Sequence, residues 1–419
     1  MGSPRSLLRD SDFLKFWTGQ SISVFGSQFS GLAIPYAATV ILKASPFQFG
    51  VLGSLGSIAF LLFSLNVGVW VDRHRRKATM IIADIGRAAT LALVPIGYLL
   101  GFLSMNMFFA LAFFQGVLTV FFEISYQSYV PTLVAREQLI DANGKLETTR
   151  ALSSGIGPAI AGLVINFVSA PLAVIGDTLG YLSSASSLSL IRKPELKREP
   201  TKRSTWADIR EGVGVVFGDR RLWQIAACTG TANLFSSALF AIIVPYFHNE
   251  LLLGSFAIGG VLSMGAVGSV AAGLVSSRIS QKIGVGPAVI LSAFAFGLPS
   301  IGIYLATAQT ALPLVGVSLF IQGVGVIIYN VTQVSYRQAL VPRKLLGRMN
   351  ATMRFIVTGM APIGAFMGGV LAQFMGYHAA IGISVVGSSL AFLWVLFSPI
   401  RKVKNMPMIE EETDQPSSG

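Results

Sequence analysis

The amino-acid sequence predicts an all-α membrane protein whose twelve transmembrane helices form two pseudo-symmetric six-helix bundles. Three observations support this prediction. Of the 419 residues, 53% are hydrophobic and 12% are charged, whereas soluble domains carry about 25% charged residues. Apolar runs long enough to cross a bilayer recur along the chain. The second half of the chain also repeats polar and glycine positions of the first half at a constant spacing.

The apolar runs number twelve, and each approaches the ~20 residues that a helix needs to cross the hydrocarbon core. The first run follows a polar start and lacks a small-residue cleavage site, so we expect it to remain as an uncleaved helix. The expected spans are 16–41, 47–71, 79–101, 105–131, 150–170, 172–191, 224–247, 256–277, 286–308, 310–335, 351–375 and 377–399.

The distribution of basic residues predicts the orientation in the membrane. The formal net charge is +12, and with both termini inside, every Lys and Arg except Lys43 falls in an inner loop, a terminus or an inner helix end. This asymmetry follows the positive-inside rule, so we expect both termini in the cytoplasm. The excess of Lys and Arg over Asp and Glu is then explained by membrane topology and by contact with membrane lipids, and nucleic acid is not an expected partner.

The sequence contains no familiar catalytic or metal-binding pattern. Cys228 is the only cysteine, and His74, His248 and His378 are dispersed, so neither a disulfide framework nor a metal cluster is expected. A phosphate-cradling Gly-x-x-x-x-Gly-Lys-Ser/Thr sequence and an acyl-transfer nucleophile motif are both missing. We therefore expect neither an enzyme nor a bound cofactor.

An internal repeat divides the chain into related halves. One constant shift along the chain pairs Gln115-Gly116-Val117 with Gln322-Gly323-Val324, and Asn143 with Asn350, without a gap. Because each half holds an even number of spans, the two repeats are parallel. The predicted domains are an N-terminal six-helix bundle at 1–191, a cytoplasmic linker at 192–221, a C-terminal six-helix bundle at 222–400 and a disordered cytoplasmic tail at 401–419.

Charged residues crowd the short loop after the second span, in the sequence Gly68-Val-Trp-Val-Asp72-Arg73-His74-Arg75-Arg76-Lys77. This loop resembles the Gly-x-x-x-Asp-Arg-x-x-Arg-Lys signature of the major facilitator superfamily. The resemblance implies the major facilitator fold, with Asp72 at an inner gate beside the N-terminal dipole of the eleventh span; a plain topogenic cluster is the alternative. The implied gate residues are Gly68, Asp72, Arg73, Arg76 and Lys77, with a weaker echo at Arg278 and Lys282.

The fifth span contains Gly155-Ile-Gly157-Pro158-Ala-Ile-Ala161-Gly162, which is similar to the Gly-Pro-x-x-Gly-Gly element of drug/proton antiporters. Gly157, Pro158 and Gly162 would kink the helix and let it pack closely against a neighbour. Ordinary packing of small residues is the alternative. The stretch 122–147 further resembles bacterial exporters of the enterobactin-exporter and macrolide-efflux branch.

The chain departs from the superfamily pattern in the fourth span. The antiporter motif Arg-x-x-Gln-Gly would place its arginine at position 112, where this chain has Ala112 before Gln115-Gly116. Ser27 likewise follows Gly26 in the first span, where many relatives carry an acid. The usual proton-coupling residues are therefore not all in place.

Ionisable residues inside spans are expensive, which makes Glu123 and Asp177 the candidate proton-coupling residues. By resemblance the fourth span lines the central cavity, where Glu123 would face its repeat partner Asn330. The alternatives are a structural Glu123 packed against Tyr126 or an arginine, and an Asp177 that forms internal hydrogen bonds.

Two further pairs of opposite charge are each spaced three residues apart, and we interpret neither as a proton-coupling site. Asp84 and Arg87 are three residues apart on one helical face, so we expect them to form an ion pair. Glu147 and Arg150 have the same spacing, and we interpret them as parts of the inner gate.

The resemblance implies a secondary active transporter with a small-molecule substrate, protons and membrane lipids as partners. We expect a monomer in the bacterial inner (plasma) membrane that couples a proton gradient to efflux of hydrophobic or amphipathic molecules, drug, macrolide or siderophore-like, by alternating access. An importer or facilitator of a small polar solute and a lipid flippase stay open as alternatives. The candidates for lining the cavity are Phe25, Gln28, Phe122, Tyr126, Phe235, Tyr329 and Asn330.

Overall fold

The computed structural model describes residues 7–135, 138–195, 205–342 and 345–405, which form helices and contain no strand within these ranges. The first half comprises η1 (Leu7–Arg9), α1 (Ser11–Val40), α2 (Pro46–Arg73), α3 (Arg76–Leu99), α4 (Met105–Leu133), α5 (Leu139–Val168), α6 (Ala170–Ala173) and α7 (Ile175–Ser189). The second comprises α8 (Thr205–Gly218), α9 (Arg220–Asn249), α10 (Ser255–Ile283), α11 (Val285–Gly297), η3 (Leu298–Ser300), α12 (Ile301–Leu305), α13 (Ala311–Leu340), α14 (Leu346–Leu390), α15 (Leu393–Leu396) and η5 (Pro399–Lys402).

The helices account for twelve membrane crossings. Within the described ranges, nine helical runs are long and apolar enough to span a bilayer. One of these, Leu346–Leu396, holds two crossings, because Gly376 breaks α14 with φ 80° and ψ 163°. The 30-residue helix α1 and the broken pair α6 and α7 supply the remaining two. The predicted fold class is thus confirmed, and the protein is a multi-pass membrane protein.

The starts of several helices follow from their capping residues. The Asp10 carboxylate accepts hydrogen bonds from the first turn of α1, and Ser45 forms a capping box with Gln48 at the start of α2. Ser104 and Asp219 cap α4 and α9 in the same manner. These polar caps satisfy backbone N–H groups at the ends of helices whose interiors are apolar.

The two halves have equivalent helices in equivalent order. The starts of α4 and α5 correspond to the starts of α13 and α14 in almost the same register, and both ends of α1 correspond to both ends of α9. Lys43 and Leu252, which are equivalent when α1 is aligned with α9, both adopt a positive φ after these first helices. The domain boundaries stay a prediction, since 196–204 and 406–419 lie outside the described ranges.

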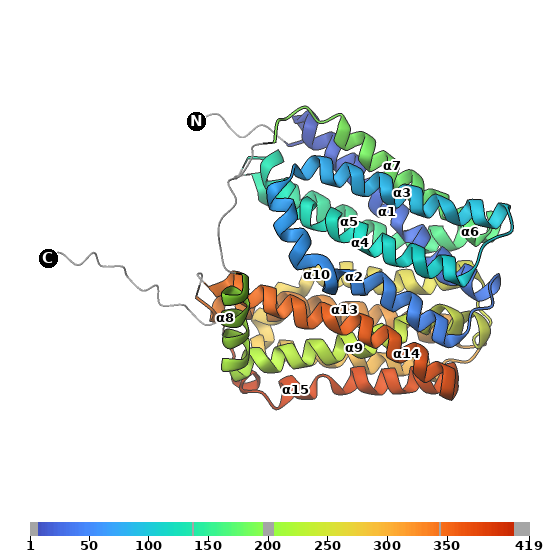
Figure 1. The fold of residues 1–419 in the computed structure, drawn as a ribbon. Coiled ribbons are helices and arrows are strands. Elements are labelled where there is room, and N and C mark those ends of the chain that lie inside the picture. The colour runs from blue at the N-terminus through green and yellow to red at the C-terminus, as the bar shows by residue number, and fades with distance from the viewer. Residues whose placement is uncertain (1–6, 136–137, 196–204, 343–344, 406–419) are drawn as a thin grey trace.

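The halves contact each other chiefly through α2 against α14 and α5 against α10 (Figure 1). We call the end of the helices where α1 begins and α8 lies the linker end, and the opposite end the far end. Gly50 of α2 meets the backbone of Gly369, and Gly162 of α5 meets Ser255, both near the far end. Small residues allow these close approaches, because a side chain at either glycine would collide with the partner backbone.

Candidate functional site

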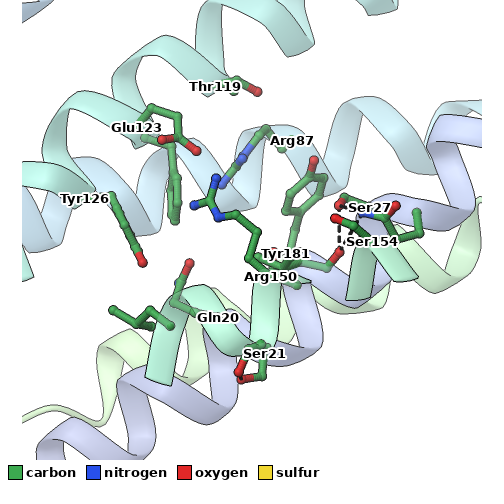
Figure 2. Close-up of a pocket in the computed structure, with 16 residues that line it drawn as sticks. Gln20, Ser21, Ser27, Arg87, Thr119, Glu123, Tyr126, Arg150, Ser154 and Tyr181 are labelled. Carbon is green, nitrogen blue, oxygen red and sulfur yellow. Dashed lines mark hydrogen bonds between the residues drawn. The ribbon is translucent and has the colours of Figure 1, made fainter. Parts of the chain in front are cut away.

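The first half encloses a cavity of about 360 Å³, which we call the charged cavity. Five helices line it: α1, α3, α4, α5 and α7 (Figure 2). Its charged residues are Arg87, Glu123 and Arg150. Arg87 lies on α3, and Glu123 and Arg150 lie in the last half of α4 and the first half of α5, so the cavity lies nearer to the linker end than the glycine contacts between the halves.

Arg87 is held in place by an ion pair and by two aromatic rings. Its guanidinium pairs with the Asp84 carboxylate one turn earlier in α3, as the spacing of these residues predicts. It also lies 4.0 Å from the ring centroid of Phe122 and 4.2 Å from that of Tyr181, within the range of cation–π attraction. Asp84 is fully buried. Arg87 is therefore a fixed positive charge whose counter-charge comes from its own helix.

Glu123 points toward two arginines without being locked to either. Figure 2 shows its carboxylate directed at the guanidinium groups of Arg87 and Arg150. Among the described residues, however, Glu123 makes no ion pair within 4.0 Å. Arg150 instead lies 3.9 Å from Glu147, and both of these side chains are largely exposed. The Glu123 carboxylate can therefore exchange partners with a proton or a ligand.

The predicted lining residues divide into three groups, of which one, Tyr329 and Asn330, lies in the second half. Gln28, Phe122 and Tyr126 line the charged cavity with Glu123. Phe25 and Phe235 do not line the cavities described here. Phe25 packs edge-on against Phe29 with ring centroids 6.0 Å apart, and the Phe235 ring packs over the α carbon of Gly387.

A second cavity of about 350 Å³ adjoins the first and is mostly apolar. We call it the apolar cavity. Asp177 lies in its wall and is 2% exposed, so this candidate is not in the same cavity as Glu123. Ala112 of α4 lines the same space. Ser27, Thr119 and Tyr181 line both cavities and thus form their common boundary.

The second half contains a smaller cavity of about 220 Å³ that includes Tyr329 and Asn330. The Tyr329 hydroxyl and the Thr229 hydroxyl are 2.9 Å apart and share a hydrogen bond. Asn330 is the repeat partner of Glu123 and lies on α13, the helix equivalent to α4. The repeat therefore places an acid in one half and a neutral amide in the corresponding cavity of the other.

The predicted gate residues after α2 form contacts within the first half. The Glu195 carboxylate accepts hydrogen bonds from the backbone N–H groups of Arg76 at 2.9 Å and Lys77 at 3.2 Å, which caps the start of α3. Lys77 Nζ donates to the carbonyl of Ile191 at 2.6 Å. The side chain of Asp72 lies outside the described part of the chain, so its role stays a prediction.

The other predicted gate residues lie at exposed positions. Arg73, Arg278 and Lys282 are exposed, and a side chain at position 68 would enter open space. Their role as gate residues also stays a prediction.

Gly157, Pro158 and Gly162 lie where α5 packs against α1 and α10. A side chain at Gly157 would collide with Gln28, and the Pro158 carbonyl lies against Gly259 of α10. The Ala159 N–H donates across the halves to Ser263 Oγ at 3.1 Å, and the Gly162 carbonyl accepts from Ser255 Oγ at 3.0 Å. This segment therefore joins the two halves directly.

Sequence reasoning missed several residues of the charged cavity. The sequence pattern indicates only a structural pair for Arg87 and a part of the gate for Arg150, yet both line the cavity. Gln20, which donates to Ser184 Oγ at 2.7 Å, and Tyr181 were not singled out. The available signal for Arg87 was an arginine well inside a membrane span, which is rarely found without a function.

Comparison with known proteins identifies related transporters. The chain is 25% identical to macrolide efflux protein A of Streptococcus pyogenes over 378 residues, which covers 87% of this chain and 90% of that protein. It is 23% identical to the enterobactin exporter EntS of Escherichia coli O127:H6 over 408 residues, 94% of each protein.

A solved structure shares the fold. A bacterial homologue of the iron transporter ferroportin, in an inward-facing state, matches with a TM-score of 0.74 at 16% identity and covers 94% of this chain and 99% of its own. Residues 16–365 also match the family model of the Major Facilitator Superfamily. With its twelve crossings in two equivalent halves, this chain is a transporter that belongs to the Major Facilitator Superfamily.

Proposed function

We propose that this transporter exports hydrophobic or amphipathic small molecules by alternating access, driven by a proton gradient, with Glu123 as a coupling group. The direction is supported by the relatives, because the macrolide efflux protein and the enterobactin exporter each match nearly the whole chain. The distribution of basic residues supports a cytoplasmic linker end, and the bacterial relatives support an inner-membrane location.

The observation that carries the coupling proposal is the setting of Glu123. It is an acid inside a membrane helix, it lines the charged cavity, and it has no ion pair within 4.0 Å among the described residues. The charge of Arg87 is already balanced by Asp84. A carboxylate whose partners change as access alternates can bind a proton on one side of the membrane and release it on the other.

The contacts between the halves suggest how access alternates. Gly50 against Gly369 and Gly162 against Ser255 hold the halves together near the far end. In the opposite state these contacts open, and the linker ends come together around the predicted gate at Asp72. Such rocking of two parallel repeats about a site between them is a general transport mechanism.

Reconstituted vesicles test the proposal. A radiolabelled macrolide is used as the probe, and its uphill movement under an imposed pH gradient is measured beside its downhill exchange. Glu123→Gln preserves side-chain shape but cannot carry charge, so we expect it to abolish uphill movement and retain exchange. Asp141→Asn provides a matched control, because Asp141 pairs with Lys145 on the exposed start of α5, outside both cavities.

Two outcomes would refute the proposal. Unchanged uphill movement by the Glu123→Gln variant would remove this residue from coupling. Movement of the probe by the wild-type protein that does not respond to the pH gradient or to a protonophore would exclude proton coupling altogether.

A further inference from the structure

We propose that the apolar cavity binds the cationic group of an amphipathic substrate, with Asp177 as its counter-charge, in space left by Ala112. The inference rests on the proposed transport of amphipathic molecules and adds a charge class and a subsite to it. It assigns Asp177 to ligand recognition and leaves proton coupling to Glu123.

Asp177 is buried with an incomplete set of hydrogen-bond partners among the described residues. Its side chain is 2% exposed, and its Oδ1 atom has no hydrogen-bond partner among the described residues. Ser30 lies near this carboxyl group in the wall of the same cavity. A serine hydroxyl can donate only one hydrogen bond and carries no charge. Buried polar atoms are almost always hydrogen-bonded, so the site lacks a polar partner for at least one carboxylate oxygen.

The position of Asp177 is set by tight packing of α7 against α1. A side chain at Gly26 of α1 would collide with the Gly176 carbonyl and the α carbon of Asp177. Gly176 in turn lies against the ring of Phe29. The backbone at Asp177 therefore cannot move toward α1, and burial of the side chain keeps the carboxyl group beside the cavity before any ligand binds.

The surroundings leave a negative charge at Asp177 without a direct counter-charge. Leu52, Phe60, Leu91 and Phe108 are among the apolar residues of the cavity, and a carboxylate in such a place is strongly destabilised without a cation. Arg87 and Arg150 both line the neighbouring cavity. Asp84, Phe122 and Tyr181 already hold the Arg87 guanidinium, and Arg150 lies beside Glu147. The Arg354 guanidinium lies 4.9 Å from the ring centroid of Phe60, and none of these three arginines makes an ion pair with Asp177 among the described residues. The cation must then be a proton or a group of the ligand.

The residue at position 112 favours a cationic group of the ligand over a proton as the partner of Asp177. The antiporter pattern would place an arginine there, and Ala112 lines the same cavity as Asp177. An arginine at this position would both fill the cavity and supply a guanidinium near the carboxylate. Alanine neither fills the cavity nor supplies a charge, so the Asp177 carboxylate lies beside space that a cation from outside the protein can occupy.

The size and walls of the cavity define the ligand further. About 350 Å³ lies at the lower end of the range for small-molecule sites and admits a monocation with compact apolar substituents. Because Ser27, Thr119 and Tyr181 also border the charged cavity, the polar remainder of the molecule can extend toward Glu123 and Arg150. An amphipathic ammonium or phosphonium compound meets both conditions.

Equilibrium binding of radiolabelled tetraethylammonium, a monocation with compact apolar substituents, to the purified protein in detergent tests this assignment. Asp177→Asn preserves shape and removes the charge, so we expect at least a tenfold loss of affinity. Ala112→Arg should abolish binding, because its guanidinium pairs with Asp177, whereas Ala112→Met adds similar length without charge and should bind more tightly than the arginine variant. Glu250→Gln is the control, since Glu250 is exposed at the end of α9, outside the cavities.

Three outcomes would overturn the proposal. The first is wild-type affinity in Asp177→Asn, and the second is an equal loss of affinity in Ala112→Met and Ala112→Arg. The third is the absence of specific binding of the cation to the wild-type protein. Size-exclusion profiles establish whether each variant is folded. If Asp177→Asn does not fold, the comparison of Ala112→Met with Ala112→Arg tests the proposal. Binding in detergent requires neither a gradient nor a direction, so its failure is distinguishable from failure of proton-coupled export.

Discussion

Ser169 and Gly376, which are equivalent positions of the two repeats, share an unusual backbone conformation. Ser169 has φ 116° and ψ 155°, and Gly376 has φ 80° and ψ 163°. Each stands where the fifth helix of its half gives way to the sixth. The repeat thus preserves a sharp break in the helix, and the first half makes this break with a residue other than glycine, which is strained there.

Replacing Ser169 by glycine should stabilise the protein by about 1 kcal/mol, because the strained φ is relieved. The Ser169 hydroxyl has no hydrogen-bond partner among the described residues, so its loss removes no bond. The midpoint of thermal unfolding in detergent measures the effect. Ser189→Gly, at an exposed position at the end of α7, should instead destabilise by about 0.5–1 kcal/mol. Equal shifts of the same sign would contradict this interpretation.

Breaking the buried pair of Asp84 and Arg87 should be costly. Arg87→Met leaves the buried Asp84 carboxylate without its counter-charge, and we expect a loss of about 3–5 kcal/mol. The double variant Asp84→Leu/Arg87→Met removes both charges and should recover much of this stability. Thermal midpoints of the single and double variants form a double-mutant cycle. Additive effects would show that the two side chains do not depend on each other.

The predicted gate is tested at Asp72. We expect Asp72→Asn to insert and fold like the wild-type protein but to reduce transport at least tenfold, since the charge that closes the linker ends is lost. Transport of the labelled macrolide is compared at equal membrane abundance, with the exposed Asp141→Asn variant as the control. Wild-type rates in Asp72→Asn would exclude the gate.

The capping residue Asp219 predicts a dependence of stability on pH. Its side chain hydrogen-bonds Arg221, which together with backbone N–H groups lowers the pKa of the carboxyl below the usual value of 3.8 despite partial burial. A lowered pKa in the folded state stabilises the protein above pH 3.8, and this contribution disappears as the pH falls through the folded-state pKa.

Asp219→Asn preserves a capping side chain but removes the charge, so it should destabilise by about 0.5 kcal/mol at pH 7, a small effect because the pair is partly exposed. The difference in thermal midpoint from the wild-type protein should shrink below pH 3.8. A difference that stays constant from pH 7 to pH 3 would contradict the assignment.

The membrane-spanning organisation could be predicted from the sequence because its determinants are local. A helix that crosses a bilayer needs about 20 apolar residues wherever it stands, and the apolar runs show this without knowledge of their neighbours. The internal repeat likewise appears in the order of residues, and Glu123 could be singled out because an acid in an apolar run is visible as such.

The grouping of side chains into cavities was decided by the tertiary structure. Arg87, Phe122 and Tyr181 come from three helices and meet only through the packing of the bundle, and the same packing separates Asp177 from Glu123. In a soluble helix an apolar stripe marks the buried face. In a membrane helix both lipid and interior favour apolar residues, so the sequence carries almost no signal for which face turns inward, and Phe25 and Phe122 could be told apart only in the folded molecule.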